Sequence, residues 1–335
     1  MEEPFPPSSP GSSPVQLADC LDDLLKFIIS SSIEETLEID LGLSKEYCSD
    51  LLKVDIENSN FDDSDNSRGI PLYPLYKRLA SALHRCLTFG DFLRTSNEMM
   101  LIKGDASLKQ KEDEWNKMVR DEGSKLVKML KTVDFELHVQ EPFLTQLRVG
   151  LKSIEGRCAV GNYNRIGPGS LLLFNKFLLL EVQDVKWYAS FSEMLNAESL
   201  EKVLPGVKTI EEGVQIYRKF YTEEKENSNG VVAICVSKPA SQPYISLAAI
   251  VSGLSYEGIG SLLGLMHTEG TIPDALPPLK TALLSSFMMP HNPHVNGSSL
   301  TEGARALAKH VNRGGNRWWG SFDGNGKYLS YTPFT

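Results

Sequence analysis

The sequence lacks the marks of several large protein classes. Its five cysteines are odd in number and contain no CxxC pair, which argues against a disulfide framework or a cysteine metal site. No run of about 18 apolar residues occurs, and the N-terminal stretch is acidic and proline-rich, unlike a signal peptide. Phosphate-loop, Rossmann and HExxH motifs are absent. We therefore expect an intracellular protein, nuclear or cytoplasmic, with no cofactor and no membrane partner.

Positive charge is also scarce. The formal net charge of -9 argues against a protein that coats nucleic acid non-specifically, because phosphate binding requires local positive charge. The charge is uneven: residues 1–132 carry 16 basic and 24 acidic residues, residues 143–238 carry 12 and 11, and residues 239–335 carry 6 and 5. The acidity therefore lies almost wholly in the first part of the chain.

Composition divides the chain into four parts. Residues 1–14 are rich in proline and serine, which is typical of a disordered tail. Apolar residues recur at spacings of three and four over residues 15–132 and predict an acidic, all-helical domain. Residues 133–238 show short apolar runs between turn residues and helical segments, and residues 239–335 predict a mostly helical extension.

The third part, residues 133–238, has the pattern of an α+β domain. FELHV, LKSIEGRCAV, SLLLF, FLLLEVQDVKWYAS and GVVAICVSK predict strands. EPFLTQLRVG, which ends at Gly150, FSEMLNAESLEKVL and TIEEGVQIYRKFY predict helices. Short strands with helices at their ends predict a small mixed β-barrel with capping helices, preceded by the helical domain and followed by the extension.

The segment VGLKSIEGR concentrates charge beside two glycines. On a regular strand Lys152 lies on the face opposite Glu155 and Arg157, because side chains alternate between faces. For all three to line one cleft, the backbone must turn or bulge near Gly150 or Gly156. The alternative is a Glu155–Arg157 surface pair that only keeps a strand solvated.

A longer segment around these residues resembles a known family. QEPFLTQLRVGLKSIEGR is similar to the signature of the ASCH domain, the homology domain named after activating signal cointegrator 1. RIGPGSLLLF resembles the strand entry that follows in that family, and YRKFY with GVVAICV resembles its last helix and strand. The resemblance implies a barrel of roughly 100 residues, similar to PUA domains, with a cleft at the signature.

In that family the cleft implies a site for RNA or a modified nucleotide, with Lys152 and Arg157 on phosphates and Glu155 on a base. Some relatives are amidohydrolases that use lysine, threonine and glutamate, with the threonine three residues after the lysine. Here that position is Glu155, and Ser153 is one position away. Hydrolysis by a ribonuclease or amidohydrolase using Lys152 and Glu155 stays the alternative to binding.

Other cations of the barrel are candidates for RNA contacts, namely Arg165, Lys176 and Arg218. Tyr217 and Tyr221 are spaced to stack on unpaired bases or to pack their helix on the barrel, and packing is the simpler interpretation.

The C-terminal extension contains the only clearly positive stretch. Cations and aromatic residues alternate at helical spacing after a cap at Thr301, which suits phosphate and base contacts: Arg305, Lys309, Arg313, Arg317 and Trp318. The tryptophans could instead anchor this tail on the barrel. The stretch resembles a "GARALaKHa.R…WG…G" box of plant RNA-binding ASCH proteins, but the final GNGKYLSYTPFT departs from it.

Two further features bear on function. His291 and His294 have no cysteine or carboxylate close by, so no metal site is predicted. The zinc-binding region that accompanies ASCH in the cointegrator proteins is missing. RNA is thus the expected partner, and a protein-interaction scaffold of the transcription-coactivator type, acting through the acidic helices, remains a third hypothesis.

Overall fold

The computed structural model describes residues 15–55, 73–90, 106–265, 274–290, 301–306, 321–322 and 328–329. The chain divides into two compact units. The first joins Met1–Leu52 to Leu75–Ala275, and the second joins Lys53–Pro74 to Leu276–Thr335.

The N-terminal part of the first unit is helical, as predicted. Its helices are α1 (Leu17–Ile33), α2 (Lys45–Leu52), α3 (Leu75–Phe89) and α4 (Ala106–Lys131). Each of α1, α2 and α3 buries an apolar face, and α1 packs on both α2 and α3. Ser44 caps α2 by accepting a hydrogen bond from the Tyr47 amide at 3.1 Å.

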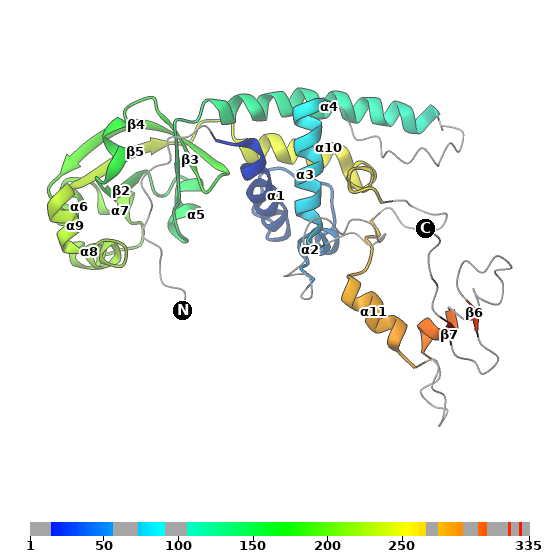
Figure 1. Cartoon of the computed structure of the whole chain (residues 1–335). Helices are drawn as coiled ribbons and strands as arrows, with labels where there is room; N and C mark the ends of the chain where they lie inside the picture. Colours follow the sequence, from blue (N-terminus) through cyan, green and yellow to red (C-terminus); the bar gives the residue numbers. More distant parts are fainter. Residues whose placement is uncertain are drawn as a thin grey trace. The chain divides into compact units, whose positions relative to one another are not determined.

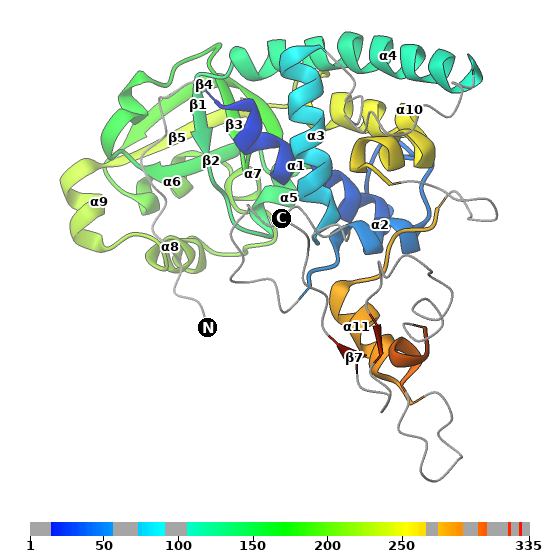
Figure 2. The same ribbon diagram turned by 45° about the vertical axis from the view of Figure 1, so that its right-hand side comes forward.

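A helix that follows the barrel in the sequence completes this bundle. α10 (Pro243–Leu263) packs along α4 and also against α1 and α3 (Figures 1 and 2). Gly253 lies against Met118 and Gly258 against Trp115, so the absence of Cβ atoms permits close approach. By length and composition α10 could cross a membrane, but it is largely buried here. We placed this segment in the C-terminal extension, whereas the structure places it with the N-terminal helices.

Five strands form the curled, half-barrel sheet that the pattern predicted. They are β1 (Phe135–Leu137), β2 (Ile154–Cys158), β3 (Leu171–Phe174), β4 (Leu178–Tyr188) and β5 (Val231–Ser237). Their order is β1-β3-β4-β5-β2. β1 pairs with β3 in parallel and the remaining pairs are antiparallel, with a register shift in β4 between Val182 and Asp184.

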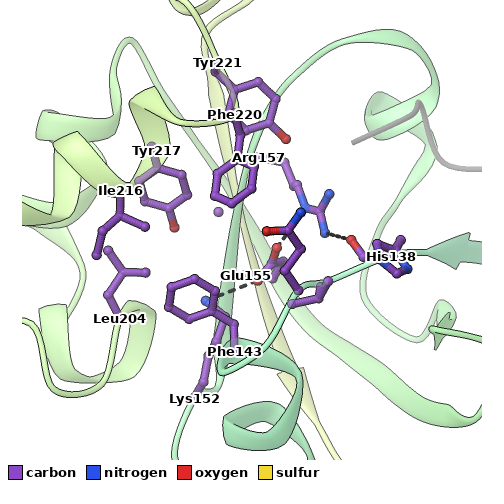
Figure 3. A pocket seen from close by; sticks show the side chains of 13 residues that line it. His138, Phe143, Lys152, Glu155, Arg157, Leu204, Ile216, Tyr217, Phe220 and Tyr221 are labelled. Carbon is purple, nitrogen blue, oxygen red and sulfur yellow. Dashed lines mark hydrogen bonds and ion pairs between the residues drawn. The ribbon is translucent and has the colours of Figure 1, made fainter. Parts of the chain in front are cut away.

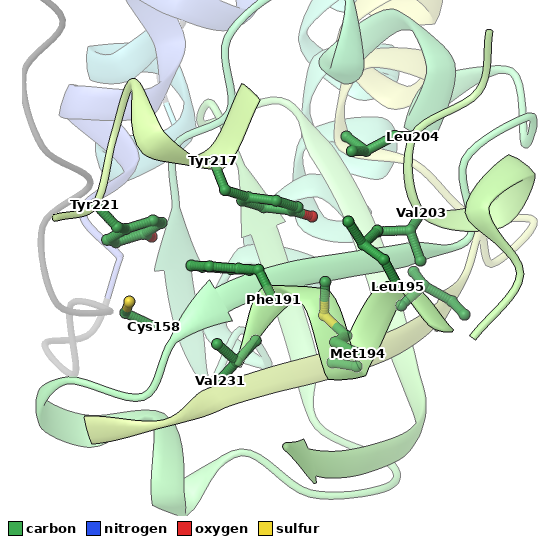
Figure 4. Close-up of a cluster of buried hydrophobic side chains, with 11 residues drawn as sticks. Cys158, Phe191, Met194, Leu195, Val203, Leu204, Tyr217, Tyr221 and Val231 are labelled. Carbon is green, nitrogen blue, oxygen red and sulfur yellow. The ribbon is translucent and has the colours of Figure 1, made fainter. Parts of the chain in front are cut away.

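Short helices cap the sheet. They are α5 (Phe143–Arg148), α6 (Phe191–Ala197), α7 (Leu200–Val203), α8 (Ile210–Arg218) and α9 (Glu223–Asn229). The single helix predicted for FSEMLNAESLEKVL is two helices, α6 and α7, and α9 was not predicted. Side chains from α6, α7 and α8 meet those of β2 and β5 in one buried apolar cluster (Figure 4).

Aromatic stacking joins the helices to the barrel within the first unit. The ring of Phe27 in α1 stacks on Phe177 with centroids 3.8 Å apart, and meets Tyr244 of α10 edge-on. The guanidinium of Arg148 lies 5.6 Å from the centre of the Phe27 ring. These ring contacts join α1 and α10 to the barrel.

The described part of the second unit is small. It contains α11 (Lys280–Met288), β6 (Ser321–Phe322) and β7 (Tyr328–Leu329). Asp55 accepts a hydrogen bond from the Thr281 hydroxyl at 2.9 Å. Thr301 caps the short helical turn that follows it, as predicted, by accepting from the Ala304 amide at 3.1 Å.

Candidate functional site

The backbone turns sharply before the charged strand. After α5 the chain passes through Gly150, whose φ of +79° is in the left-handed region. The Lys152 amide then bonds back to the Gln146 carbonyl at 3.1 Å, and β2 begins two residues later. The turn predicted near Gly150 or Gly156 is thus at Gly150, whereas Gly156 pairs with Ala233 in a regular register.

This turn brings the three charged side chains together. The Lys152 Nζ lies 3.1 Å from Oε2 of Glu155, and the Arg157 Nε lies 2.8 Å from Oε1. Lys152, Glu155 and Arg157 are only 3%, 7% and 4% exposed. The alternative of a solvated surface pair is therefore wrong, and we call these three residues the buried ion trio.

The donors of Lys152 are fully used inside the protein. Its ammonium donates to the Ile154 carbonyl at 2.8 Å, to the Val203 carbonyl, and to Glu155. An ammonium has three N–H groups, so none remains for a phosphate. Arg157 donates from Nη2 to the His138 carbonyl at 2.6 Å. Lys152 therefore has no N–H group available for the phosphate contact that the resemblance implied, because its three donors contact Glu155 and two backbone carbonyls.

Burial and pairing set the charge state of the trio. Burial alone would raise the pKa of Glu155, but the charges of Lys152 and Arg157 outweigh it and lower this pKa below its usual value of 4.5. Burial lowers the pKa of Lys152, and the Glu155 carboxylate opposes that shift. Burial also tends to lower the pKa of Arg157, yet Glu155 raises it overall. Glu155 is thus an ionised carboxylate at neutral pH.

A pocket opens above the trio, and we call it the signature pocket (Figure 3). About 530 Å³ of space lies in the pocket when it is counted out to its open mouth, of which only about 60 Å³ admits the centre of a water-sized sphere. Four aromatic side chains and several aliphatic ones surround the ion trio. The lining residues are His138, Val139, Gln140, Phe143, Lys152, Glu155, Gly156, Arg157, Leu204, Ile216, Tyr217, Phe220 and Tyr221.

The packing interpretation of the two tyrosines is confirmed. Tyr217 and Tyr221 are buried in the apolar cluster, and each stacks on Phe191, as the packing interpretation expected. Both also line the signature pocket. Phe143 and Phe220 are half-buried there, and the Lys152 ammonium lies 5.7 Å from the centre of the Phe143 ring.

Sequence reasoning missed Phe143, Phe220 and His138 as lining residues. Phe143 follows the proline of the signature and Phe220 precedes Tyr221, but helical periodicity alone assigns both to packing. The available signal was the position of Phe143 within the signature and of Phe220 within the YRKFY segment.

The other predicted cations lie away from this pocket. Arg165 is exposed in a 3-10 turn. Lys176 occupies the hairpin between β3 and β4 with a φ of 64°, and it pairs with Asp23 of α1 at 3.3 Å. It lines a separate open groove between α1 and the barrel. Arg218 forms an ion pair with the buried Glu226. The structure does not bring these three to the ion trio.

The C-terminal candidates are mostly outside the described residues. Arg305 is half-buried in the turn after Thr301, in the second unit. The candidates that lie outside the described residues are Lys309, Arg313, Arg317 and Trp318, together with His291 and His294. Across the described ranges, no group of three or more His, Cys, Asp or Glu side chains could hold a metal ion.

The fold and pocket define a small PUA-like barrel with an aromatic-walled pocket beside its signature strand. The family model for the ASCH domain matches residues 137–240. Two solved structures are similar to about a third of the chain. "Crystal structure of hypothetical protein PH0355" is 44% identical with a TM-score of 0.31, covering 31% of this chain and 97% of that one. The solution NMR structure of protein PF0455 from Pyrococcus furiosus is 46% identical with a TM-score of 0.29, covering 32% and 97%.

No curated protein matches this chain. The family model, together with the identity and coverage of these relatives, shows that the chain belongs to the ASCH-domain family. Its PUA-like fold is generally linked to RNA binding. The resemblance of residues 301–320 to a plant box lies beyond the residues that the family model matches.

Proposed function

We propose that this protein binds RNA by taking one unstacked base into the signature pocket. The observation that carries the proposal is the combination of aromatic walls with an ion trio whose charges are paired inside the protein. Single-stranded RNA suits such a pocket, because unstacked bases can be splayed out and stacked on aromatic side chains.

The charges favour a base over a phosphate. Lys152 has no N–H group left to donate, and Arg157 is paired with Glu155. The trio as a whole carries one net positive charge, but that charge lies on groups already paired inside the protein, and the Glu155 carboxylate can accept a hydrogen bond from a base. The chain also carries a net charge of -9, so binding that depended on phosphate neutralisation would be weak. In this proposal the trio shapes and polarises the floor of the pocket, and the aromatic rings bind the base.

No observation favours hydrolysis over binding. The residues that line the signature pocket include no serine, threonine or cysteine, so no such nucleophile faces it. The Ser153 backbone is held between the Lys202 carbonyl and the Val236 amide, and Ser153 is not among the lining residues.

The acidic helices have a structural role that needs no protein partner. They bury their apolar faces on one another, on α10 and, through Phe27, on the barrel. The five cysteines, all within the described ranges, form no disulfide, and four are buried. A reducing, intracellular location, which remains part of the proposal, agrees with this.

The test is a fluorescence anisotropy titration of a short labelled single-stranded RNA. We expect Phe220→Ala to weaken binding by about 1–3 kcal/mol, the usual contribution of one base–aromatic stack. Trp187→Ala is the matched control, because Trp187 is a half-exposed aromatic residue of β4 that does not line the pocket. Equal affinities for wild type and Phe220→Ala would refute base stacking in this pocket.

A further inference from the structure

Tyr217 presents a buried hydroxyl that nothing in the described structure satisfies. The residue is 6% exposed and lines the signature pocket. The backbone of Gly156 lies beside its oxygen, but the hydroxyl donates to no acceptor among the described residues. Buried polar groups are nearly always paired, so an unpaired one in a pocket calls for an explanation.

Packing holds this hydroxyl in place. The Tyr217 ring stacks on Phe191 with centroids 4.1 Å apart and planes within 9° (Figure 4). A Cβ atom on Gly156 would come within 2.5 Å of the hydroxyl oxygen, so only glycine leaves room for it. The ring therefore cannot swing to a different partner without disturbing the apolar cluster.

The hydroxyl points into the cavity as a donor. It is directed toward the side where Phe143 and Leu204 lie (Figure 3). Burial, followed by the negative charge of Glu155, raises the pKa of Tyr217 well above its usual value. The hydroxyl thus stays protonated throughout the physiological pH range and can donate a hydrogen bond to an acceptor on a ligand.

We infer that the Tyr217 hydroxyl donates a hydrogen bond to an acceptor on the edge of the bound base and so determines which base the pocket prefers. The ligand class is a heteroaromatic ring with a ring nitrogen or carbonyl oxygen at that edge. The inference rests on the proposed function, because it assumes that a base enters the pocket. It adds the residue that distinguishes one base from another.

The test compares Tyr217→Phe with Tyr188→Phe. The first change removes only an unpaired hydroxyl and keeps the stacked ring. The second removes a hydroxyl that donates to Glu198 at 2.7 Å and does not line the pocket. The probes are homopolymeric RNA oligomers of A, C, G and U, and an abasic oligomer of equal length. Affinity and the urea midpoint of unfolding are measured for each protein.

We expect wild type to prefer one oligomer, and Tyr217→Phe to lose roughly 10-fold in affinity for it, with abasic binding unchanged. Its unfolding midpoint should equal or exceed that of wild type, whereas Tyr188→Phe should lower the midpoint and leave the base preference intact.

Three results would overturn the inference while leaving the proposed function standing: wild type binds every base equally, Tyr217→Phe keeps the wild-type preference, or Tyr217→Phe is destabilised as Tyr188→Phe is. If wild type bound the intact oligomers no better than the abasic one, the proposed function itself would fail.

Discussion

Lys152 and Glu155 are joined by a contact of 3.1 Å between Nζ and Oε2, although Lys152 precedes β2 and Glu155 lies within it. Both side chains are almost fully buried. The turn at Gly150 makes this contact possible, and it converts a charged segment into the floor of a pocket.

The first prediction concerns the stability of the buried ion trio. Lys152→Met should lower the free energy of unfolding by about 3–5 kcal/mol, because it removes one of the two cations paired with the buried Glu155 carboxylate. The double variant Lys152→Met with Glu155→Gln should recover part of that loss. Urea unfolding measures both. The control is Lys117→Ala, an exposed change on α4 that should stay within about 0.5 kcal/mol of wild type. A single variant as stable as wild type would contradict the pairing.

The second prediction concerns how the free energy of unfolding depends on pH in acid. The pKa of Glu155 is lowered in the folded protein, so its ionised form stabilises the fold above its usual pKa of 4.5. This contribution to stability is lost as the pH falls through the lowered pKa that Glu155 has in the folded protein. The difference in unfolding free energy between wild type and Glu155→Gln should therefore be constant from neutral pH down to about 5 and shrink in stronger acid. A difference that stays constant in acid would show that Glu155 is not stabilised as its anion.

The third prediction compares the effect on stability of an alanine at Gly156 with that of an alanine at a glycine that has no close neighbours. Gly156→Ala should destabilise the protein by about 1–3 kcal/mol, because its Cβ would meet Tyr217 and Met194 at 2.5 and 2.7 Å. It should also weaken RNA binding, since Tyr217 lines the pocket. Gly167→Ala is the control, with nothing within 4 Å of its Cβ and no positive φ. Comparable unfolding midpoints for the two variants would argue against close packing at Gly156.

The fourth prediction concerns Arg218, which the sequence marked as an RNA contact. In the structure it pairs with Glu226, which is 1% exposed and also accepts from the Phe191 amide at 2.5 Å. Arg218→Ala should therefore lower the thermal midpoint and leave the RNA affinity unchanged. Loss of RNA affinity without loss of stability would restore the RNA-contact role.

Much of the fold could be predicted from the sequence, because periodicity reports local structure. The predicted strands of residues 133–238 all occur, and the charge spacing required a backbone turn that Gly150 provides. Partners distant in sequence could not be predicted. The packing of α10 on α4 depends on glycines that meet Met118 and Trp115 across the bundle, and no local pattern encodes that contact.

The sequence indicated how the three charges could meet but not the physical character of the place where they do. Alternation along a strand showed that they needed a backbone turn to share one cleft, but not that they would be buried. Only the tertiary structure shows that the carbonyls of Ile154 and Val203 take up the donors of Lys152. Of the aromatic wall residues, Phe143 and Tyr217 lie on helices α5 and α8 and Phe220 and Tyr221 follow α8, and helical periodicity there indicates packing alone.

The most direct test of the central claim is a competition between a short single-stranded RNA and the same ribose-phosphate backbone without bases. We predict that the intact RNA binds wild type at least about 10-fold more tightly. That ratio should fall toward one in Phe220→Ala and stay at the wild-type value in Trp187→Ala. An abasic backbone that binds wild type as tightly as intact RNA would show that the protein holds phosphates, and would contradict the account.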